Sequence, residues 1–91
     1  KMTKQEVRNS IIKLNPKDII EHFEYTKEQL EELTHMESRF FFPVTRYEVK
    51  RVGFLEWDRN TSDFYSYCIP ESMLENISTK NTGKNWENLS W

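Results

Sequence analysis

The feature that most constrains the fold is a run of β-branched and aromatic residues at Arg46–Trp57, followed at once by a polar segment, Asp58–Asp63. A second aromatic run, Phe64–Ile69, comes directly after that segment. Two such runs about a short polar connection are typical of an antiparallel hairpin. We therefore predict a β-hairpin within residues 39–69, with the rest of the chain packed against it.

The alternation of apolar residues changes phase within the first run. Tyr47 and Val49 would share one face of the strand, whereas Val52 and Phe54 would share the other. The change occurs near Gly53, so a β-bulge at this glycine is one explanation, because an inserted residue reverses the facing of all residues that follow. The other explanation is a strand that is covered on both faces.

Residues 1–38 carry the signals of short helices. Thr3 and Glu6 have the spacing of a capping box, and so do Thr26 and Gln29. The pair Asn15–Pro16 ends one helix and starts the next, because proline disfavours helical geometry in the residue before it and suits the first helical position. The apolar faces of three helices are then Val7, Ile11 and Leu14; Ile19, Ile20 and Phe23; and Leu30, Leu33 and Met36.

The segments that flank the hairpin complete a single α+β domain over residues 1–91. Pro43 follows three phenylalanines, which restricts Phe40–Pro43 to an edge strand or the start of a strand. Pro70–Ile77 reads as a short helix, and residues 78–91 as a polar loop and then a last strand or docked tail that contains Trp86, Leu89 and Trp91. We expect short N-terminal helices (1–38) packed on a β-hairpin or three-stranded antiparallel sheet (39–69), then a short C-terminal helix with a strand or tail (70–91).

The charge of the chain is slightly acidic, with a net charge of −2 and a sequence pI of about 5.7. Nucleic-acid-binding domains usually carry a basic patch or a pI well above neutral. Residues 39–57 form the only segment with a positive balance, because they hold four basic and two acidic side chains. If the chain binds nucleic acid, this segment is the expected contact.

Cysteine content and hydropathy indicate the compartment. Cys68 is the only cysteine, so an intrachain disulfide is excluded, and small secreted domains usually contain several pairs. No signal peptide and no run of eighteen apolar residues is visible. We expect a cytoplasmic protein that makes no membrane contact.

The sequence contains few residues that are candidates for metal binding, phosphate binding or catalysis. His22, His35 and Cys68 lack the paired short spacings of zinc ligands, so no metal or other cofactor is expected. The two glycines, Gly53 and Gly83, cannot form a glycine-rich phosphate loop. Cys68 could pair with a histidine as a nucleophile, but its place in the apolar run Tyr65–Ile69 favours a buried thiol that packs as a small hydrophobic residue. We expect no catalytic residues and no enzyme.

Six carboxylates lie close together in the second and third predicted helices: Asp18, Glu21, Glu24, Glu28, Glu31 and Glu32. With Lys17 and Lys27 this segment has a net charge of −4. Such a run is either a solvated helix face or a surface that meets a basic partner, for which complementary charge speeds the encounter.

The run Lys50–Trp57 resembles the octamer of RNA-recognition motif (RRM) domains. Five positions agree with that pattern: Lys50, Gly53, Phe54, Leu55 and Trp57. Arg51 and Val52 depart from it. Ile11–Pro16 lies upstream at a distance similar to that of the family's first strand, with Asp18–Tyr25 as the following helix. The resemblance implies that Phe54 stacks on a base and that Lys50 contacts phosphate. The alternatives are a helix end at Ile11–Pro16 and a hairpin whose aromatics form the core.

The order of elements also resembles an excisionase-type winged helix-turn-helix domain. Leu14–Phe23 would be its first helix, Thr26–Thr34 its recognition helix and Phe42–Phe54 its wing. The resemblance implies DNA binding. The chain departs from this expectation in chemistry, because the recognition helix would turn three glutamates towards phosphate.

The function expected from these observations is that of a small non-catalytic binding or regulatory module that occupies a surface of a partner protein. Mixed charge of this kind also permits self-association. The expected contact residues are Glu24, Glu28, Glu31, Glu32, Arg46, Lys50 and Arg51.

Richness in Asn, Lys, Ile and Glu resembles that of phage and mobile-element proteins, which favours an inhibitor of host machinery acting in the host cytoplasm, with a nucleic-acid-binding host protein as one partner class. The alternative function is nucleic-acid binding by the hairpin, through Lys50, Arg51, Phe54 and Trp57.

Overall fold

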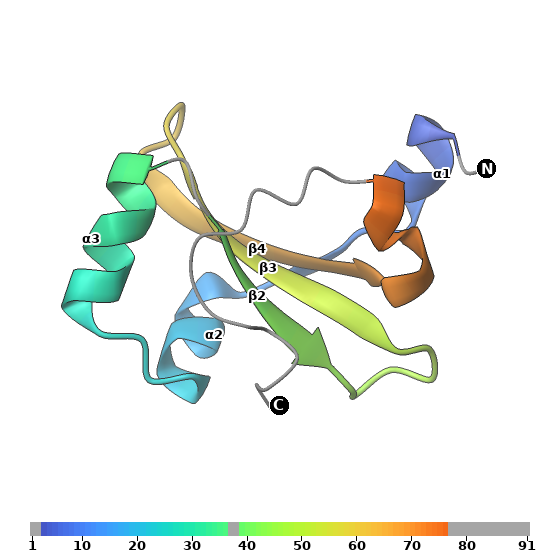
Figure 1. Ribbon diagram of the computed structural model, residues 1–91, viewed down its shortest axis with the longest axis horizontal. Coiled ribbons are helices and arrows are strands. Elements are labelled where there is room, and N and C mark those ends of the chain that lie inside the picture. The colour runs from blue at the N-terminus through green and yellow to red at the C-terminus, as the bar shows by residue number, and fades with distance from the viewer. Residues whose placement is uncertain (1–2, 37–38, 77–91) are drawn as a thin grey trace.

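The computed structural model describes residues 3–36 and 39–76, and these form an α+β fold (Figure 1). Four antiparallel strands make one sheet in the order β1-β4-β3-β2. The predicted fold class is confirmed, and the sheet has four strands where two or three were expected. The elements in chain order are α1 (Lys4–Asn9), β1 (Ile12–Leu14), α2 (Pro16–His22), α3 (Lys27–Met36), β2 (Arg39–Val44), β3 (Arg51–Asp58), β4 (Asp63–Pro70) and the 3-10 helix η1 (Glu71–Asn76).

The predicted hairpin is β3 and β4, paired continuously from Asp58 and Asp63 at the turn to Arg51 and Pro70 at the far end. Its first strand begins at Arg51, so the expectation that residues 46–50 belong to that strand was wrong; they form a loop. The register through Gly53 is unbroken on both sides, so there is no bulge. The other explanation, a strand covered on both faces, is correct.

Strand β1 is the element that the periodicity missed. α1 ends at Asn9, and the following Ile12–Leu14 pairs with Cys68–Ser66 of β4. The helical spacing of Ile11 and Leu14 after Val7 predicted a longer first helix, and that prediction was wrong. Ile12 and Leu14 both pack into the core from the edge of the sheet. This tertiary packing stabilises a strand here, and the local spacing of apolar residues does not reveal it.

Helix starts follow the predicted capping chemistry. The Thr3 hydroxyl accepts from the Glu6 amide while the Glu6 carboxylate accepts from the Thr3 amide. Thr26 and Gln29 make the same reciprocal pair at the start of α3. Asn15 accepts from the Lys17 amide ahead of Pro16, so the N-terminus of α2 is capped as expected.

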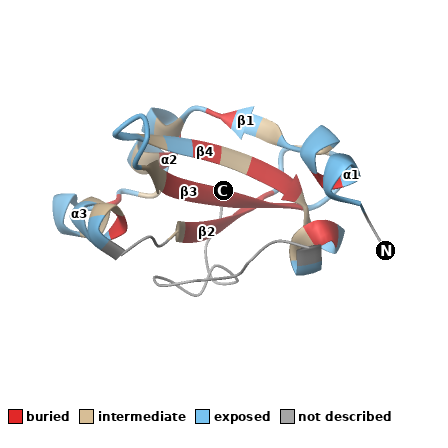
Figure 2. Ribbon diagram, turned by 90° about the horizontal axis from the view of Figure 1, so that it is seen from above, coloured by how far each residue is buried: buried red, intermediate tan, exposed pale blue. Residues whose placement is uncertain are grey.

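Both faces of the sheet are covered, by different helices. α2 and α3 lie at one end of the molecule and α1 and η1 at the other (Figure 1). The first core cluster joins one face of the sheet to α2 and α3 through residues such as Ile19 and Leu33. The second joins the opposite face to α1 and η1 through Val7 and Met73. Strand β3 lies between them and is buried from Arg51 to Glu56 (Figure 2).

Gly53 is required by the packing of the first cluster. The ring of Phe42 on the neighbouring strand lies over it, and a Cβ built on Gly53 would be 2.1 Å from Phe42 Cε2. The glycine thus makes room for an aromatic ring on β2, and this, not a bulge, accounts for its place in the strand.

At the C-terminal end, the expected helix Pro70–Ile77 is found in part, as the 3-10 helix η1 over Glu71–Asn76, whereas Pro70 is the last residue of β4 and residue 77 lies outside the described residues. Pro43 lies in β2, which is an edge strand as the proline required. The predicted strand or tail with Trp86, Leu89 and Trp91 lies outside the described residues. Among residues 3–36 and 39–76, no helix is long and apolar enough to cross a membrane.

Candidate functional site

The surface with the most distinctive chemistry is formed by α2, α3 and the turn between them, here called the α2–α3 face. The amide of Glu24 donates to the Glu21 carbonyl and the amide of Tyr25 donates to the Ile20 carbonyl, both at 3.2 Å. This is the hydrogen-bond pattern of a Schellman motif, in which the residue after the helix cap is left-handed and usually glycine. Here that residue is Glu24, with a φ of 52°.

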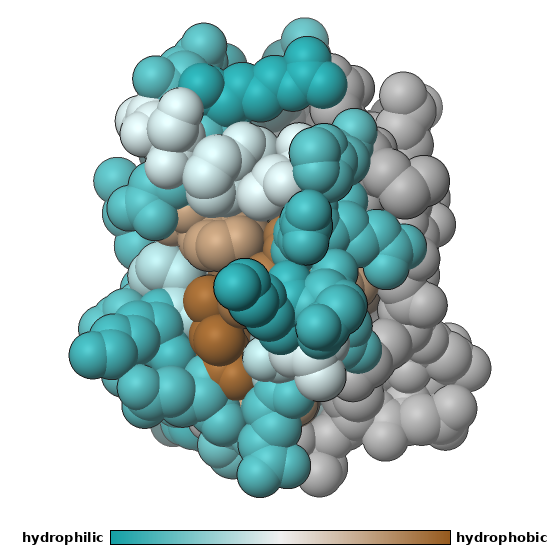
Figure 3. Space-filling model, turned by 90° about the vertical axis from the view of Figure 1, so that its left-hand side faces the viewer, coloured by the Kyte–Doolittle hydropathy of each residue, from teal (hydrophilic) through white to brown (hydrophobic). Residues whose placement is uncertain are grey.

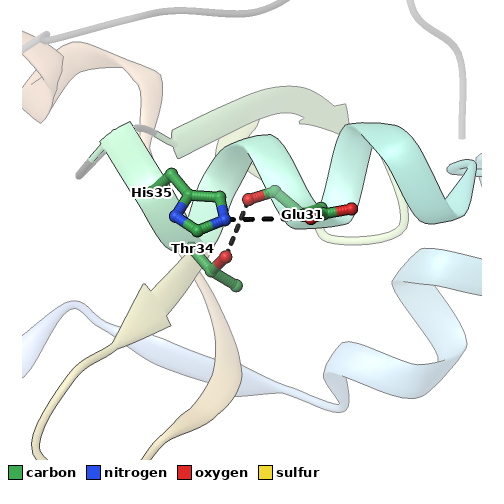
Figure 4. A network of polar contacts seen from close by, with 3 residues as sticks. All are labelled: Glu31, Thr34 and His35. Carbon is green, nitrogen blue, oxygen red and sulfur yellow. Dashed lines mark hydrogen bonds and ion pairs between the residues drawn. The ribbon is translucent and has the colours of Figure 1, made fainter.

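The predicted acidic contact residues are all exposed on this face: Glu24, Glu28, Glu31 and Glu32. Glu28, Glu31 and His35 follow one another at helical spacing along the outer side of α3. Figure 4 shows that side, where His35 Nε2 lies 3.8 Å from Glu31 Oε1 and the Thr34 hydroxyl donates to the Glu31 carbonyl at 2.7 Å. These are local contacts within one helix and leave the carboxylates facing solvent.

Apolar side chains interrupt this acidic surface. Ile20, Phe23 and Leu30 are half-buried and pack on the first core cluster from α2, the turn and α3. Figure 3 views the molecule from this side and shows apolar surface in the middle of the face, with hydrophilic side chains around it. An apolar centre with a charged rim is the usual composition of a protein-binding surface.

The predicted basic contacts do not join this face. Arg46 and Lys50 lie in the loop between β2 and β3, whereas α3 leads into the opposite end of β2. Both are exposed; the Arg46 guanidinium lies 5.3 Å from the Tyr47 ring centroid, and Lys50 Nζ lies 3.4 Å from a carboxylate oxygen of Glu71. The two charge sets therefore belong to separate surfaces.

Arg51, the third predicted basic contact, is a core residue that is only 8 % exposed. Its Nε donates to Cys68 Sγ at 3.2 Å, and its Nη2 donates to the carbonyls of Cys68 and Ser10. The Tyr47 ring lies over the guanidinium, with its centroid 5.6 Å away. Arg51 ties β3, β4 and the end of α1 together, and its charged atoms are occupied by these contacts.

The residues predicted for nucleic-acid binding are not assembled into one surface. Phe54 is completely buried in the second cluster, whereas Arg51 and Trp57 point to the opposite face of the sheet. Trp57 is half-buried and packs edge-on against Phe64, with ring centroids 5.0 Å apart. The stacking role that the RRM resemblance implied for Phe54 is therefore not available in this structure.

The winged-helix resemblance is also corrected in part. Phe42–Phe54 spans the second half of β2, the loop and the first half of β3, and both strands belong to the sheet, so it is not a projecting wing. Strand β1 and helix α2 do follow the order that the RRM resemblance implied for residues 11–25.

Cys68 is fully buried, as its apolar setting predicted, whereas His22 and His35 are exposed on helices. In the part of the chain that the structure describes, no group of three or more His, Cys, Asp or Glu side chains could hold a metal ion.

Sequence reasoning missed a polar network on the sheet face opposite α2 and α3. Arg39 Nε lies 2.6 Å from Glu56 Oε1, and both side chains are largely buried. Tyr65 and Tyr67 stack with centroids 5.8 Å apart. Burial, with a further contribution from the Glu56 carboxylate, raises the pKa of both tyrosines above the ordinary phenol value.

The same reasoning missed a pocket of about 590 Å³ beside β1. Its lining is mostly apolar and includes residues from β1, β3 and β4: Ile11, Lys13, Leu14, Pro16, Asp58, Phe64, Tyr65, Ser66 and Tyr67. Two signals pointed to the strand that forms one side of this pocket: the β-branched pair Ile11–Ile12 and the RRM resemblance, which placed a first strand at Ile11–Pro16.

Comparison of the chain with protein-family models, with curated proteins and with solved structures found no match.

Proposed function

We propose that the protein is a non-catalytic binding module that occupies a basic surface of a partner protein with its α2–α3 face. The observation that carries this proposal is the ring of exposed carboxylates, on both helices and their connecting turn, around the half-buried Ile20, Phe23 and Leu30. Neither feature alone distinguishes a contact surface from a solvated helix, but together they have the composition of an interface.

The two features would have different roles in binding. Burial of the apolar centre would supply affinity at about 25 cal/mol per Å² removed from water. The carboxylates would accelerate encounter and exclude acidic surfaces, and this effect weakens as salt rises. The partner surface that fits is therefore basic, with apolar side chains at its centre.

Glu24 supports the proposal from backbone geometry. A left-handed non-glycine residue costs about 1–2 kcal/mol relative to an ordinary conformation, and glycine would relieve that cost. A glutamate at such a position is consistent with selection for its charge at the expense of stability.

Site-specific photo-cross-linking tests this proposal. A photoreactive residue is placed at Glu28 or Glu32 on the α2–α3 face, and, as matched controls, at Glu48 or Glu75, which are exposed carboxylates on other elements. We expect the α3 positions alone to cross-link a protein in cells of the source organism, through a basic peptide of that protein. Equal cross-linking from all four positions would contradict the proposal.

Charge reversal provides the second readout. Glu28→Lys with Glu32→Lys should abolish the cross-link from a probe placed at Glu31, whereas Glu48→Lys with Glu75→Lys should not. A salt titration with labelled single strands and duplexes covers the other binding class. Tight binding that falls steeply with salt and is insensitive to the α3 reversal would overturn the proposal in favour of nucleic acid.

A further inference from the structure

The pocket beside β1 lies where the chain turns from β1 into α2. Leu14 is the last residue of β1 and pairs with Ser66, after which Asn15 continues in extended conformation to Pro16 at the start of α2. Residues of this corner and of β4 line the pocket together. Its volume of about 590 Å³ is within the usual range for a bound small molecule.

Most of the polar side chains around the pocket project from one face of the sheet. Lys13 pairs with Tyr67, and Tyr65 is two residues away on the same strand, so these three share a face. Asp58 is on that face as well, because it follows by four residues Phe54, the partner of Tyr67 on β3. This is the face opposite α2 and α3. A ligand in the pocket would therefore meet two tyrosine rings, with a carboxylate near one end.

Exposed apolar side chains are concentrated at this pocket. Ile11 is 36 % exposed and Tyr65 is 41 % exposed, and both line it. In residues 3–36 and 39–76 the only other exposed large hydrophobic residue is Val49, in the loop before β3. Single exposed apolar residues are common on proteins. Two at one pocket provide apolar surface that a ligand would remove from water.

The charge that can select a ligand is that of Asp58. Its carboxylate accepts from the Asn60 amide at 2.8 Å, which holds it in place, and Asp63 is its cross-strand partner. Lys13 is exposed on a long stem, so a ligand would have to immobilise it at an entropic cost. Its row is four residues of β4, or about 13 Å, from that of Asp58, which exceeds the screening length of about 8 Å at physiological salt. Arg59 is exposed in the turn and does not line the pocket.

The tyrosine rings favour the same kind of ligand. Tyr65 and Tyr67 stack with centroids 5.8 Å apart, and both hydroxyls interact with the Glu56 carboxylate on β3. Glu56 is itself paired with Arg39 at 2.6 Å, so it does not compete with Asp58 for a ligand. Aromatic rings stack on other aromatic rings and attract cations to their faces.

We infer that this pocket binds an aromatic amine, a small molecule with a planar ring system and a positively charged amino group. The ring system would lie against Tyr65, Tyr67 and Ile11, and the ammonium group would lie near Asp58. Burial of the ring would supply affinity, and the fixed carboxylate would supply selectivity for charge. The site is separate from the α2–α3 face and does not depend on the function proposed for that face.

Three indole probes of similar size test the charge preference with the full chain at neutral pH: the cation tryptamine, the uncharged alcohol tryptophol and the anion indoleacetate. Amide chemical shifts are followed in each titration. We expect saturable shifts at Lys13, Asp58, Tyr65 and Tyr67, with a dissociation constant of about 1–5 mM for tryptamine. Tryptophol should bind roughly two- to fivefold more weakly, and indoleacetate more weakly still.

Protein variants assign the contacts. Asp58→Asn keeps an oxygen that can accept from the Asn60 amide, so it should weaken tryptamine roughly two- to fivefold and leave tryptophol unchanged. The control Asp18→Asn removes an exposed carboxylate from α2 and should change neither affinity. Ile11→Ser should weaken all three probes because it removes part of the apolar wall, whereas Val49→Ser, at an exposed apolar residue elsewhere, should weaken none.

Several results would each overturn the inference. These are the absence of a saturable shift at the pocket with any probe, equal affinities for tryptamine and tryptophol, and shifts confined to α2 and α3. Tightest binding by indoleacetate would do the same, because it would mean that Lys13 and not Asp58 selects the ligand.

Discussion

Gly53 shows how one residue without a side chain can organise a core. The Phe42 ring fills the space that a Cβ would need. We predict that Gly53→Ala lowers the free energy of unfolding by about 1–3 kcal/mol, because the ring must leave its position in a well-packed cluster. Urea denaturation monitored by tryptophan fluorescence measures the change.

A double-mutant cycle identifies the cause. Phe42→Leu removes the ring atoms that the new methyl group would meet, so Gly53→Ala should cost less in that background than in the wild type. Equal costs in both backgrounds would show that backbone effects dominate and that the ring contact is not responsible.

Glu24 is a second residue at which backbone and side chain conflict. We predict that Glu24→Gly raises the free energy of unfolding by about 0.5–1 kcal/mol, since relief of the left-handed conformation outweighs the added flexibility of the unfolded chain. Thermal unfolding checks the sign of this effect.

Glu24→Ala is the matched control, because it removes the same carboxylate but keeps a Cβ. If both variants stabilise equally, repulsion among the carboxylates is the cause and the backbone explanation is wrong. If the α2–α3 face binds as proposed, both variants should weaken the partner cross-link in spite of their different stabilities.

Arg51 shows why residue identity alone did not predict which charged residues form the contact surface. Arginine is rarely buried, so a basic residue at the start of a strand reads as a surface charge. Its burial depends on acceptors that are distant in sequence, the Cys68 sulfur and the Ser10 carbonyl. The exposed glutamates of α3 could be predicted, because helical periodicity alone places them opposite Leu30 and Leu33.

At the scale of elements, local side-chain chemistry predicted where the helices begin better than where they end. Thr26, Asn15 and their amide partners specify helix starts within a few residues of sequence, and all were correct. The strand assignment of Ile12–Leu14 depends on pairing with β4 more than fifty residues later. The helical spacing of Ile11 and Leu14 favoured a helix end over the strand that the RRM resemblance implied, so the pocket beside this strand was not predicted.

Helix α3 combines a face that determines stability with one that does not. Leu33 is fully buried, and we predict that Leu33→Ala lowers the free energy of unfolding by about 2–5 kcal/mol. The exposed pair of Glu31 and His35 should contribute no more than about 0.5 kcal/mol, so His35→Ala should be nearly neutral. Chemical denaturation of the two variants tests this contrast. A large loss for His35→Ala would mean that the outer side of α3 is structural and not free for a partner.

For the molecule as a whole, β3, one of the two inner strands of the sheet, is buried on both faces, and this limits where a partner can bind. The first cluster covers one face under α2 and α3, and the second covers part of the other under α1 and η1. The contact proposed for the α2–α3 face therefore uses the outer surface of these helices and not an open face of the sheet.

Three buried tyrosine side chains are expected to make the folded protein less stable at alkaline pH. Burial raises the pKa of Tyr25, Tyr65 and Tyr67 above the value of about 10 that phenols have in an unfolded chain. Above that pH the unfolded chain has lost these protons while the folded protein keeps them, so it binds fewer protons than the folded protein. Stability is therefore fully present below about pH 10 and falls as the pH rises further.

We predict that the urea midpoint is nearly constant up to about pH 9 with respect to these groups and declines steeply above about pH 10. Tyrosinate absorbance should rise together with the loss of tryptophan packing, because the phenols ionise on unfolding.

A double variant, Tyr65→Phe with Tyr67→Phe, is the control. It should flatten the decline of the urea midpoint at high pH, and Tyr25 should account for the decline that remains. If the double variant declines as steeply as the wild type, burial of the two phenols and their interaction with the Glu56 carboxylate have no energetic consequence for the fold.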